Sequence, residues 1–227
     1  MKKIIVAVDG FSSCGKSTMA KELARETGYI YVDTGAMYRA VSLFCIRQGL
    51  MSDTEMNEQA IGAELTNMLL EFRTNETGKS EIYLNGENVE SSIRTLEVAN
   101  GASRVSTLGV VRRELVRQQQ LMGLNKGIVM DGRDIGTVVF PQAELKIFLT
   151  ASPEIRAQRR MDEMNAKGEV VDYESVLANV KERDDRDVNR TESPLRKADD
   201  AIEIDNSNLT RLEQQVLLQK LFAEKTA

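Results

Sequence analysis

The sequence contains no histidine, only two cysteines, and no apolar run of transmembrane length. The missing histidine excludes acid–base or metal chemistry that depends on an imidazole. The cysteines are Cys14 and Cys45, and Cys14 lies inside a glycine-containing loop, which is a poor position for a structural disulfide. We therefore expect two free thiols in a reducing compartment, and a soluble, cytoplasmic protein.

An excess of basic charge is also absent, because the net charge is −5. No overall positive field attracts the chain to nucleic acid or to an anionic membrane, and we predict neither as a partner. Lys2 and Lys3 precede an apolar run as in a signal peptide, but the run is shorter than the roughly seven to fifteen residues of such a segment. The 227 residues, 41% of them apolar, suit one sizeable α/β domain with room for an inserted subdomain. No feature demands an interface, so a monomer is the default expectation.

A phosphate-binding loop is the most informative motif that is present. Residues 10–17 read Gly-Phe-Ser-Ser-Cys-Gly-Lys-Ser, directly after the strand-like run 4–8 and directly before a helical pattern. The glycines allow backbone N–H groups to point at an anion, Lys16 would reach the terminal phosphates of ATP, and the Ser17 hydroxyl would bind Mg²⁺. A glycine-rich turn that happens to carry a lysine is the alternative, and the strand and helix on either side disfavour it. The residues expected to bind ATP are Gly10, Phe11, Ser12, Ser13, Cys14, Gly15, Lys16, Ser17 and Thr18.

Strand and helix patterns alternate at both ends of the chain. Besides the run at 4–8, strands are expected at about 29–32, 128–130, 145–150 and 201–204. This alternation predicts an α/β fold: a P-loop core with a five-stranded parallel sheet flanked by helices. We assign residues 1–35 and 126–227 to this core of a single kinase domain, with a short helical lid at about 155–190.

The middle of the chain has a different pattern and predicts an insertion at 36–125. Residues 54–71 have helical periodicity, with Ile61, Leu65, Met68 and Leu69 on one face. The segment 81–89 contains Asn-Gly between strand-like arms, which predicts a hairpin. Helical patterns resume at about 95–124. The insertion is therefore expected to combine helices with a hairpin.

Carboxylates follow three of the predicted parallel strands. Asp9, Asp33 and Asp131 each stand at a strand end in a turn that contains glycine. Ligands of parallel sheets bind at these carboxyl ends, so we expect the three turns to form one crevice, with Asp131 as a Mg²⁺ partner through water or an orienting carboxylate. Each alone could equally be a turn carboxylate, and their coincidence around one phosphate loop favours a site.

Arginines are concentrated where phosphoryl transfer would need them. Arg183, Arg186 and Arg190 lie among aspartates at helical spacing, which is also typical of a solvated, salt-bridged helix. Charge developing on a transferring phosphoryl group must be neutralised, and this favours a functional role for Arg183 and Arg190 over Arg159 and Arg160. No catalytic base is obvious, which suits a phosphate acceptor that is already ionised at neutral pH. Asn125-Lys126 lacks the aspartate of a guanine-reading motif, which disfavours a GTPase.

Several motifs along the chain resemble those of bacterial cytidylate kinases, in the nucleoside monophosphate kinase group. The most specific is the run 131–141, Asp-Gly-Arg-Asp-Ile-Gly-Thr-Val-Val-Phe-Pro. Others are the phosphate loop with Asp9, the run 33–39, segments at 93–95 and 98–100, and the run 181–187. The resemblance covers the chain from end to end. It implies transfer of the γ-phosphoryl group of ATP to CMP or dCMP, giving CDP or dCDP plus ADP in pyrimidine metabolism, with a monophosphate-binding insertion and an arginine-bearing lid.

The resemblance also implies roles for single residues. Tyr38, Arg39 and Arg133 would hold the acceptor phosphate; Ser103, Arg112 and Asp134 would read the cytosine; Asp187 with Arg183 would reach the ribose; and Arg190 would approach the transferring group. Lys16, Arg133, Arg183 and Arg190 are thus the expected catalytic residues. Thr34 stands where many relatives have serine, which keeps a hydroxyl for substrate binding. Ser17 stands where relatives often have glycine, so its Mg²⁺ role, with Asp131, is an interpretation of this sequence rather than of the family.

Two alternatives stay open at this point. The chain could be a P-loop kinase for another small acceptor, or a non-catalytic module that binds ATP and signals through its insertion. The arginine-dense acceptor residues disfavour the sensor.

Overall fold

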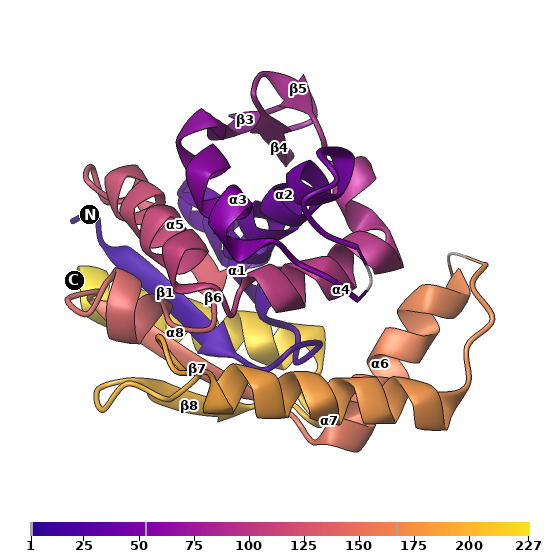
Figure 1. The fold of residues 1–227 in the computed structure, drawn as a ribbon. Helices are drawn as coiled ribbons and strands as arrows, with labels where there is room; N and C mark the ends of the chain where they lie inside the picture. Colours follow the sequence, from indigo (N-terminus) through magenta and orange to yellow (C-terminus); the bar gives the residue numbers. More distant parts are fainter. Residues whose placement is uncertain (1, 53, 167) are drawn as a thin grey trace. The chain divides into compact units, whose positions relative to one another are not determined.

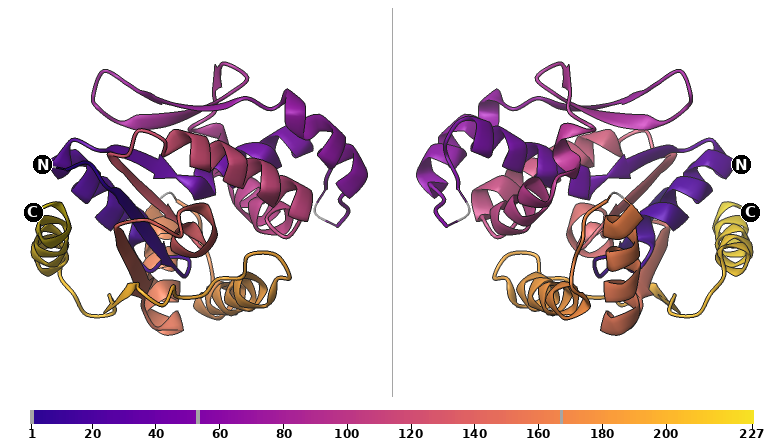
Figure 2. Two further views of the ribbon diagram at one scale, coloured as in Figure 1. Left: turned by 90° about the vertical axis from the view of Figure 1, so that its left-hand side faces the viewer. Right: turned by 90° about the vertical axis from the view of Figure 1, so that its right-hand side faces the viewer.

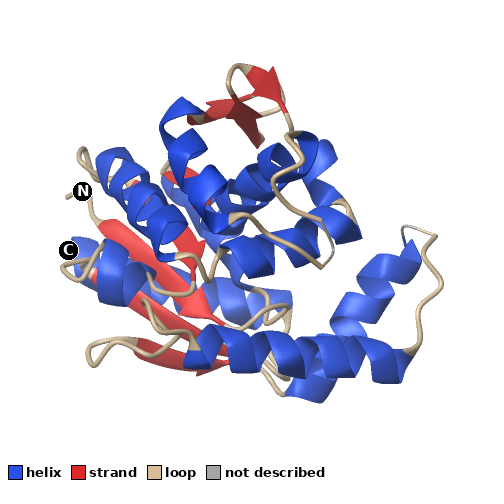
Figure 3. Ribbon diagram, in the orientation of Figure 1, coloured by secondary structure: helices blue, strands red, loops and turns tan. Residues whose placement is uncertain are grey.

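The computed structural model describes residues 2–52, 54–166 and 168–227. The chain divides into two compact units. The first unit combines the two ends of the chain, up to Tyr31 and from Gly123 onward, and the second is Val32–Met122. Figure 1 colours both along the sequence, and Figure 3 shows that each contains its own sheet and helices.

The first unit contains a five-stranded parallel sheet flanked by helices, which confirms the predicted fold class. The strand order is β2-β6-β1-β7-β8. The unit boundary falls inside β2. The elements are β1 (Ile5–Gly10), α1 (Lys16–Thr27), β2 (Ile30–Asp33), β6 (Ile128–Gly132), the π-helical turn η3 (Ile135–Val139), β7 (Leu145–Thr150), α6 (Pro153–Ala166), α7 (Tyr173–Asn189), β8 (Ile202–Asp205) and α8 (Arg211–Thr226).

The core of this unit lies between the sheet and two neighbouring helices, α1 and α8. Val6 and Val8 of the central strand β1 are buried together with Met19 and Leu23, four residues apart on α1. This spacing places both α1 side chains on one helical face. Gly28 closes α1 in the left-handed conformation, with φ of 69°, which glycine adopts without strain. The register pairs Asp9 with Gly132 and Val8 with Asp131, so the turns after β1 and β6 begin side by side.

Helices α6 and α7 pack on each other, as the two views of Figure 2 show in orange. A small apolar cluster of Ala157, Val176 and Val180 joins them. The Ser152 hydroxyl accepts a hydrogen bond from the Ile155 N–H (3.3 Å) and caps α6, and the Ser-Pro-Glu sequence is typical of such a helix start. The arginine-rich segment therefore sits on a pair of regular helices.

The second unit contains helices and a small antiparallel sheet of order β3-β4-β5. At the β4–β5 turn, Asn85 (φ 51°) and Gly86 (φ 83°) both have left-handed backbone, as a type I′ hairpin requires. The predicted hairpin is thus confirmed. The elements are α2 (Thr34–Arg47), α3 (Glu58–Glu64), the 3₁₀ turns η1 (Leu65–Asn67) and η2 (Ser92–Arg94), β3 (Leu70–Thr74), β4 (Ser80–Leu84), β5 (Glu87–Asn88), α4 (Leu96–Val105) and α5 (Gly109–Met122).

The helix expected over 54–71 is wrong outside Glu58–Glu64, the range of α3. Helix α3 ends at Glu64, and Leu70 already belongs to β3, where it pairs with Leu84 of the hairpin. Leu69, expected on the apolar helical face, is 60% exposed. This segment forms a strand because it pairs with β4, which comes later in the sequence. Helical periodicity carries no information about such pairing. None of the described helices has the length and apolar character needed to cross a membrane.

Candidate active site

The loop after β1 has the backbone geometry of an anion-binding nest. Gly10 has φ of 146° and Gly15 of 100°, and Ser13 between them also has positive φ, 59°. A Cβ atom on Gly10 would lie 2.0 Å from the Leu149 carbonyl oxygen, so only glycine fits beside β7. Left-handed residues turn successive N–H groups to one side, and α1 adds the positive end of its dipole. The loop can therefore bind a chain of phosphates.

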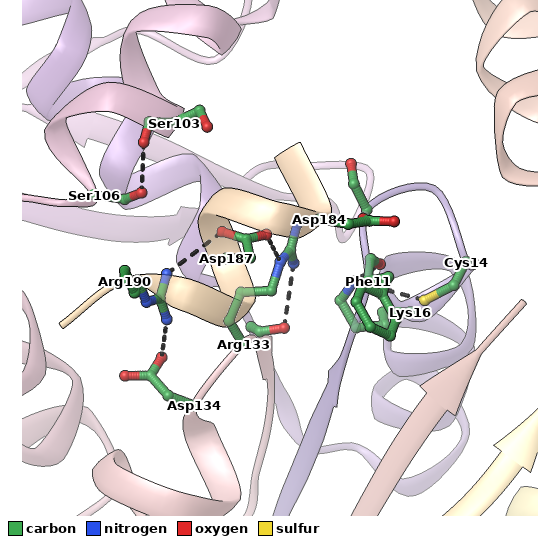
Figure 4. A network of polar contacts seen from close by, with 12 residues as sticks. Phe11, Cys14, Lys16, Ser103, Ser106, Arg133, Asp134, Asp184, Asp187 and Arg190 are labelled. Carbon is green, nitrogen blue, oxygen red and sulfur yellow. Dashed lines mark hydrogen bonds and ion pairs between the residues drawn. The ribbon is translucent and has the colours of Figure 1, made fainter. Parts of the chain in front are cut away.

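Lys16 is buried within this loop. Its Nζ donates to the Phe11 carbonyl oxygen at 2.5 Å and approaches Cys14 Sγ at 3.7 Å, and Figure 4 shows these three residues together. Burial and the neighbouring charge of Arg133 lower the Lys16 pKa from its usual value. Of the loop's remaining side chains, Ser12 and Cys14 are buried and Thr18 is exposed.

Ser17 and Asp131 lie in direct contact at the ends of α1 and β6. The Ser17 hydroxyl donates to Asp131 Oδ2 at 2.8 Å, and the Tyr31 hydroxyl donates to Oδ1 at 2.8 Å. A hydroxyl and a carboxylate are hard oxygen ligands of the kind that Mg²⁺ takes together with water and phosphate oxygens. Within the described ranges no group of three or more acidic, cysteine or histidine side chains could hold a metal by itself. The pair therefore fits a cation that a nucleotide brings with it.

A buried charge network lies at the end of β6 and on α7. Arg133 Nε donates to Asp187 Oδ2 at 2.8 Å; Arg190 lies 3.5 Å from Asp187 Oδ1 and 3.9 Å from Asp134 Oδ1 (Figure 4). Burial alone would raise the Asp187 pKa, but Arg133, Arg183 and Arg190 outweigh it and hold the pKa below its usual value. Asp187 raises the Arg133 pKa against the opposing effect of burial. The structure thus brings five of the expected site residues of this unit into one network: Arg133, Asp134, Arg183, Asp187 and Arg190.

In the second unit, Asp33 organises a pair of arginines. Its Oδ1 accepts from the Ala36 N–H at 2.9 Å and caps α2, while Oδ2 accepts from Arg39 at 2.9 Å and lies 3.5 Å from Arg94. Asp33 therefore fills the turn-carboxylate role that the sequence left open, and it also pairs with two arginines. Arg94 lies in a segment noted for its family resemblance but was not predicted as a site residue.

The remaining predicted residues of the second unit converge from three helices. The Arg112 guanidinium of α5 is 1% exposed and lies 5.6 Å from the ring centre of Tyr38 on α2. It donates to the Ser106 carbonyl oxygen at 3.2 Å, and the Ser106 hydroxyl donates to the carbonyl oxygen of Ser103 on α4 at 2.8 Å. Thr34, at the start of α2, is buried. A buried guanidinium beside a serine and an aromatic ring can recognise a polar, planar group.

Three side chains contact the phosphate loop; sequence reasoning missed Arg156 and Asn206 and ranked Arg159 below the other arginines. Arg156 and Arg159 of α6 donate to the carbonyl oxygens of Ser12 (3.3 Å) and Cys14 (3.5 Å). Asn206, after β8, donates to the Cys14 carbonyl oxygen at 2.7 Å. The i, i+3 spacing of the arginines indicates a common helical face, but nothing local indicates that this face meets a loop about 145 residues earlier.

The comparisons with known proteins agree over nearly the whole chain. The sequence model of the family described as Cytidylate kinase matches residues 6–222. A cytidylate kinase of Parabacteroides distasonis is 60% identical over 219 residues, covering 96% of each chain. One of Bacteroides thetaiotaomicron is 56% identical over 225 residues, covering 99% of this chain and 98% of the other.

Among solved structures, an uncharacterized protein of Eubacterium ventriosum has a TM-score of 0.51 at 12% identity, over 98% of this chain and 99% of that one. The protein TT1252 of Thermus thermophilus has a TM-score of 0.50 at 17% identity, over 99% and 98%. At these identities the likeness concerns the fold alone. The family match and the relatives carry the assignment, and by them the chain belongs to the cytidylate kinase family.

Proposed function

We propose that this protein transfers the γ-phosphoryl group of ATP to CMP or dCMP, producing ADP and CDP or dCDP. The observation that carries the proposal is the buried network of Arg133, Asp134, Asp187 and Arg190, in a chain that matches cytidylate kinases almost throughout. Such a network supplies cations for phosphate groups and a carboxylate for a base amino group. In this proposal the protein acts in the cytoplasm, as a monomer, on small-molecule nucleotides.

The phosphate loop binds ATP in this proposal. Its backbone N–H groups hold the donor phosphates and Lys16 neutralises the terminal ones. Ser17 and Asp131 hold Mg²⁺, directly or through water; when bound, the ion shields the charge of the β- and γ-phosphate oxygens. Arg183 and Arg190 stabilise the charge that develops on the transferring group. The helical segment that carries them acts as a lid, within about 155–190.

Each unit, taken by itself, carries side chains to which we assign roles toward the acceptor. In the second unit, Thr34, Tyr38 and Arg39 bind the acceptor phosphate, and Ser103 and Arg112 donate to the acceptor atoms of cytosine. In the first unit, Arg133 binds the acceptor phosphate, Asp134 accepts from the cytosine amino group, and Asp187 with Arg183 binds the ribose. The assignment is chemically consistent, because cytosine presents one amino donor and two acceptors. An ionised phosphate acceptor needs no protein base, which agrees with the absence of histidine from the sequence.

The test is a coupled assay of ADP release with CMP, dCMP, UMP, AMP and shikimate as acceptors. We expect turnover with the cytidine nucleotides, in the range of about 1–100 s⁻¹ that is typical of kinases, and little with AMP or shikimate. Omission of Mg²⁺ should abolish it. Absence of turnover with both cytidine nucleotides would refute the proposal.

Asp134→Ala tests the cytosine-reading role. Loss of a buried acceptor for the amino group should lower kcat/KM for CMP by a factor of about 10–100, corresponding to about 1–3 kcal/mol. ATP binding, measured by calorimetry, should change little, because the phosphate loop is intact. An equal loss of ATP affinity would contradict the assignment.

A further inference from the structure

Arg156 joins the phosphate loop to the base of α6. Its side chain is buried, at 2% exposure, and Nε donates to the Ala151 carbonyl oxygen at 2.9 Å, which fixes the plane of the guanidinium. The Arg156 Cζ atom lies 5.0 Å from the ring centre of Phe11, and Nη1 donates to the Ser12 carbonyl oxygen at 3.3 Å. One guanidinium thus contacts two residues of the loop, Phe11 and Ser12.

The same guanidinium is paired with α7. Asp184 accepts from Arg156 through both oxygens, at 2.9 Å from Nη1 and 2.5 Å from Nη2, in the forked geometry of a strong pair. Asp184 lies between Arg183 and Asp187 on α7, the helix that ends just before Arg190. Figure 4 shows Asp184 and Asp187 on this helix. The arginines of the lid are therefore connected to the phosphate loop through one buried side chain.

We propose that Arg156 and Asp184 are positioning residues for phosphoryl transfer. Their ion pair fixes α7, and with it Arg183 and Arg190, at a set distance from the phosphate loop. Arg156 also holds the Ser12 carbonyl outward, and because a trans peptide is planar, the N–H of Ser13 then points the opposite way, into the loop. The inference rests on the proposed function, in which Arg183 and Arg190 act on the group that this loop holds.

A purely structural pair would behave differently. It would lower thermal stability when broken, and leave kcat intact at temperatures far below the midpoint of unfolding. Breaking a positioning pair lowers kcat, because a displacement of reacting groups by about 1 Å can slow a reaction about 10²-fold. The affinity for ATP should hardly change in Asp184→Asn, since Arg156 keeps its contacts with Phe11 and Ser12.

The experiment compares Asp184→Asn with Asp184→Glu and Asp185→Asn. Asp185 is the matched control. It is the exposed neighbour of Asp184 on the same helix, and its carboxylate accepts a hydrogen bond from the Asn189 side chain. We expect Asp184→Asn to lower kcat for CMP by about 10²-fold, with ATP affinity near that of the wild type. Asp184→Glu should recover most of the loss, and Asp185→Asn should retain full activity. Wild-type kcat in a folded Asp184→Asn variant would overturn the inference.

Two further measurements keep the test decisive. If Asp184→Asn does not fold, the double substitution Arg156→Met with Asp184→Leu replaces the buried pair by apolar side chains, which proteins commonly tolerate. It should fold and still be slow, and wild-type kcat would refute the inference.

Hydrogen exchange with ADP separates this inference from the proposed function, because it needs no acceptor. ADP should protect the α7 amides in the wild type and not in the Asp184 variant. Equal protection in both would refute the coupling, whereas failure of the wild type to phosphorylate CMP would refute only the proposed function.

Discussion

Asp9 is a buried carboxyl group with an unusual balance of forces. It accepts hydrogen bonds from the N–H groups of Ile135 (2.8 Å) and Gly136 (2.7 Å), which favour the ionised form. Desolvation opposes them and is the larger effect, and the charge of Asp134 adds to it, so the Asp9 pKa rises from 3.8 to about 7. Through these hydrogen bonds the Asp9 carboxyl connects the end of β1 to the start of η3, directly after Asp134.

This pKa predicts how stability depends on pH. A carboxyl group with a raised folded pKa binds more protons in the folded than in the unfolded state, so its ionisation favours unfolding as pH rises from about 4 to 7. Relative to Asp9→Asn, the free energy of unfolding of the wild type should fall by roughly 2–3 kcal/mol between pH 5 and pH 8. Urea unfolding of both proteins at the two pH values measures the difference. A constant difference would show that Asp9 titrates normally.

Gly10 is a position of the phosphate loop at which no other residue type fits. Its φ of 146° is strained for any other residue, and a Cβ would overlap the Leu149 carbonyl oxygen. Gly28 also has positive φ, but a Cβ there would meet nothing within 4 Å. Gly10→Ala should therefore destabilise the protein by more than about 3 kcal/mol, and Gly28→Ala by about 1 kcal/mol. Denaturant unfolding tests the ranking, and equal losses would refute the steric argument.

At the scale of elements, the parts fixed by local chemistry were predictable from the sequence. The glycine that ends α1, the Ser-Pro start of α6 and the Asn-Gly turn of the hairpin all specify backbone conformations by themselves. Strand β3 was not predictable, because it is defined by pairing with β4. The same limit applied to the site: Arg156, Arg159 and Asn206 meet the phosphate loop only through the folded sheet.

Helix α8 offers a test of local capping that leaves the proposed site untouched. The Thr210 hydroxyl accepts from the Glu213 N–H (3.3 Å), and Glu213 Oε2 accepts from the Thr210 N–H (2.8 Å), which forms a capping box. Thr210→Ala should lower the free energy of unfolding by about 1 kcal/mol, or the melting temperature by about 2–4 °C. Thr210→Ser should restore it. We expect unchanged kcat in both variants, because α8 carries none of the proposed site residues, and a loss of activity would contradict that view.

At the scale of the whole molecule, the residues proposed for the acceptor are distributed over both compact units, whereas those proposed for ATP all belong to the first. From its change of pattern, the sequence predicts an insertion at 36–125. The unit itself runs from Val32 to Met122, and its assignment as the monophosphate-binding region stays a prediction.

Ligand-induced stabilisation can test that assignment unit by unit. A ligand at about 100 times its Kd adds about 2.7 kcal/mol to the free energy of unfolding, or roughly 5–10 °C in melting temperature for a protein of this size. Arg112→Gln, in the second unit, should remove the shift caused by CMP and keep the shift caused by ATP with Mg²⁺. Lys16→Met, in the first unit, should do the reverse. Thermal melts of the two variants with each ligand test the assignment. Loss of both shifts in Arg112→Gln would contradict the view that Arg112 is needed for CMP binding but not for ATP binding.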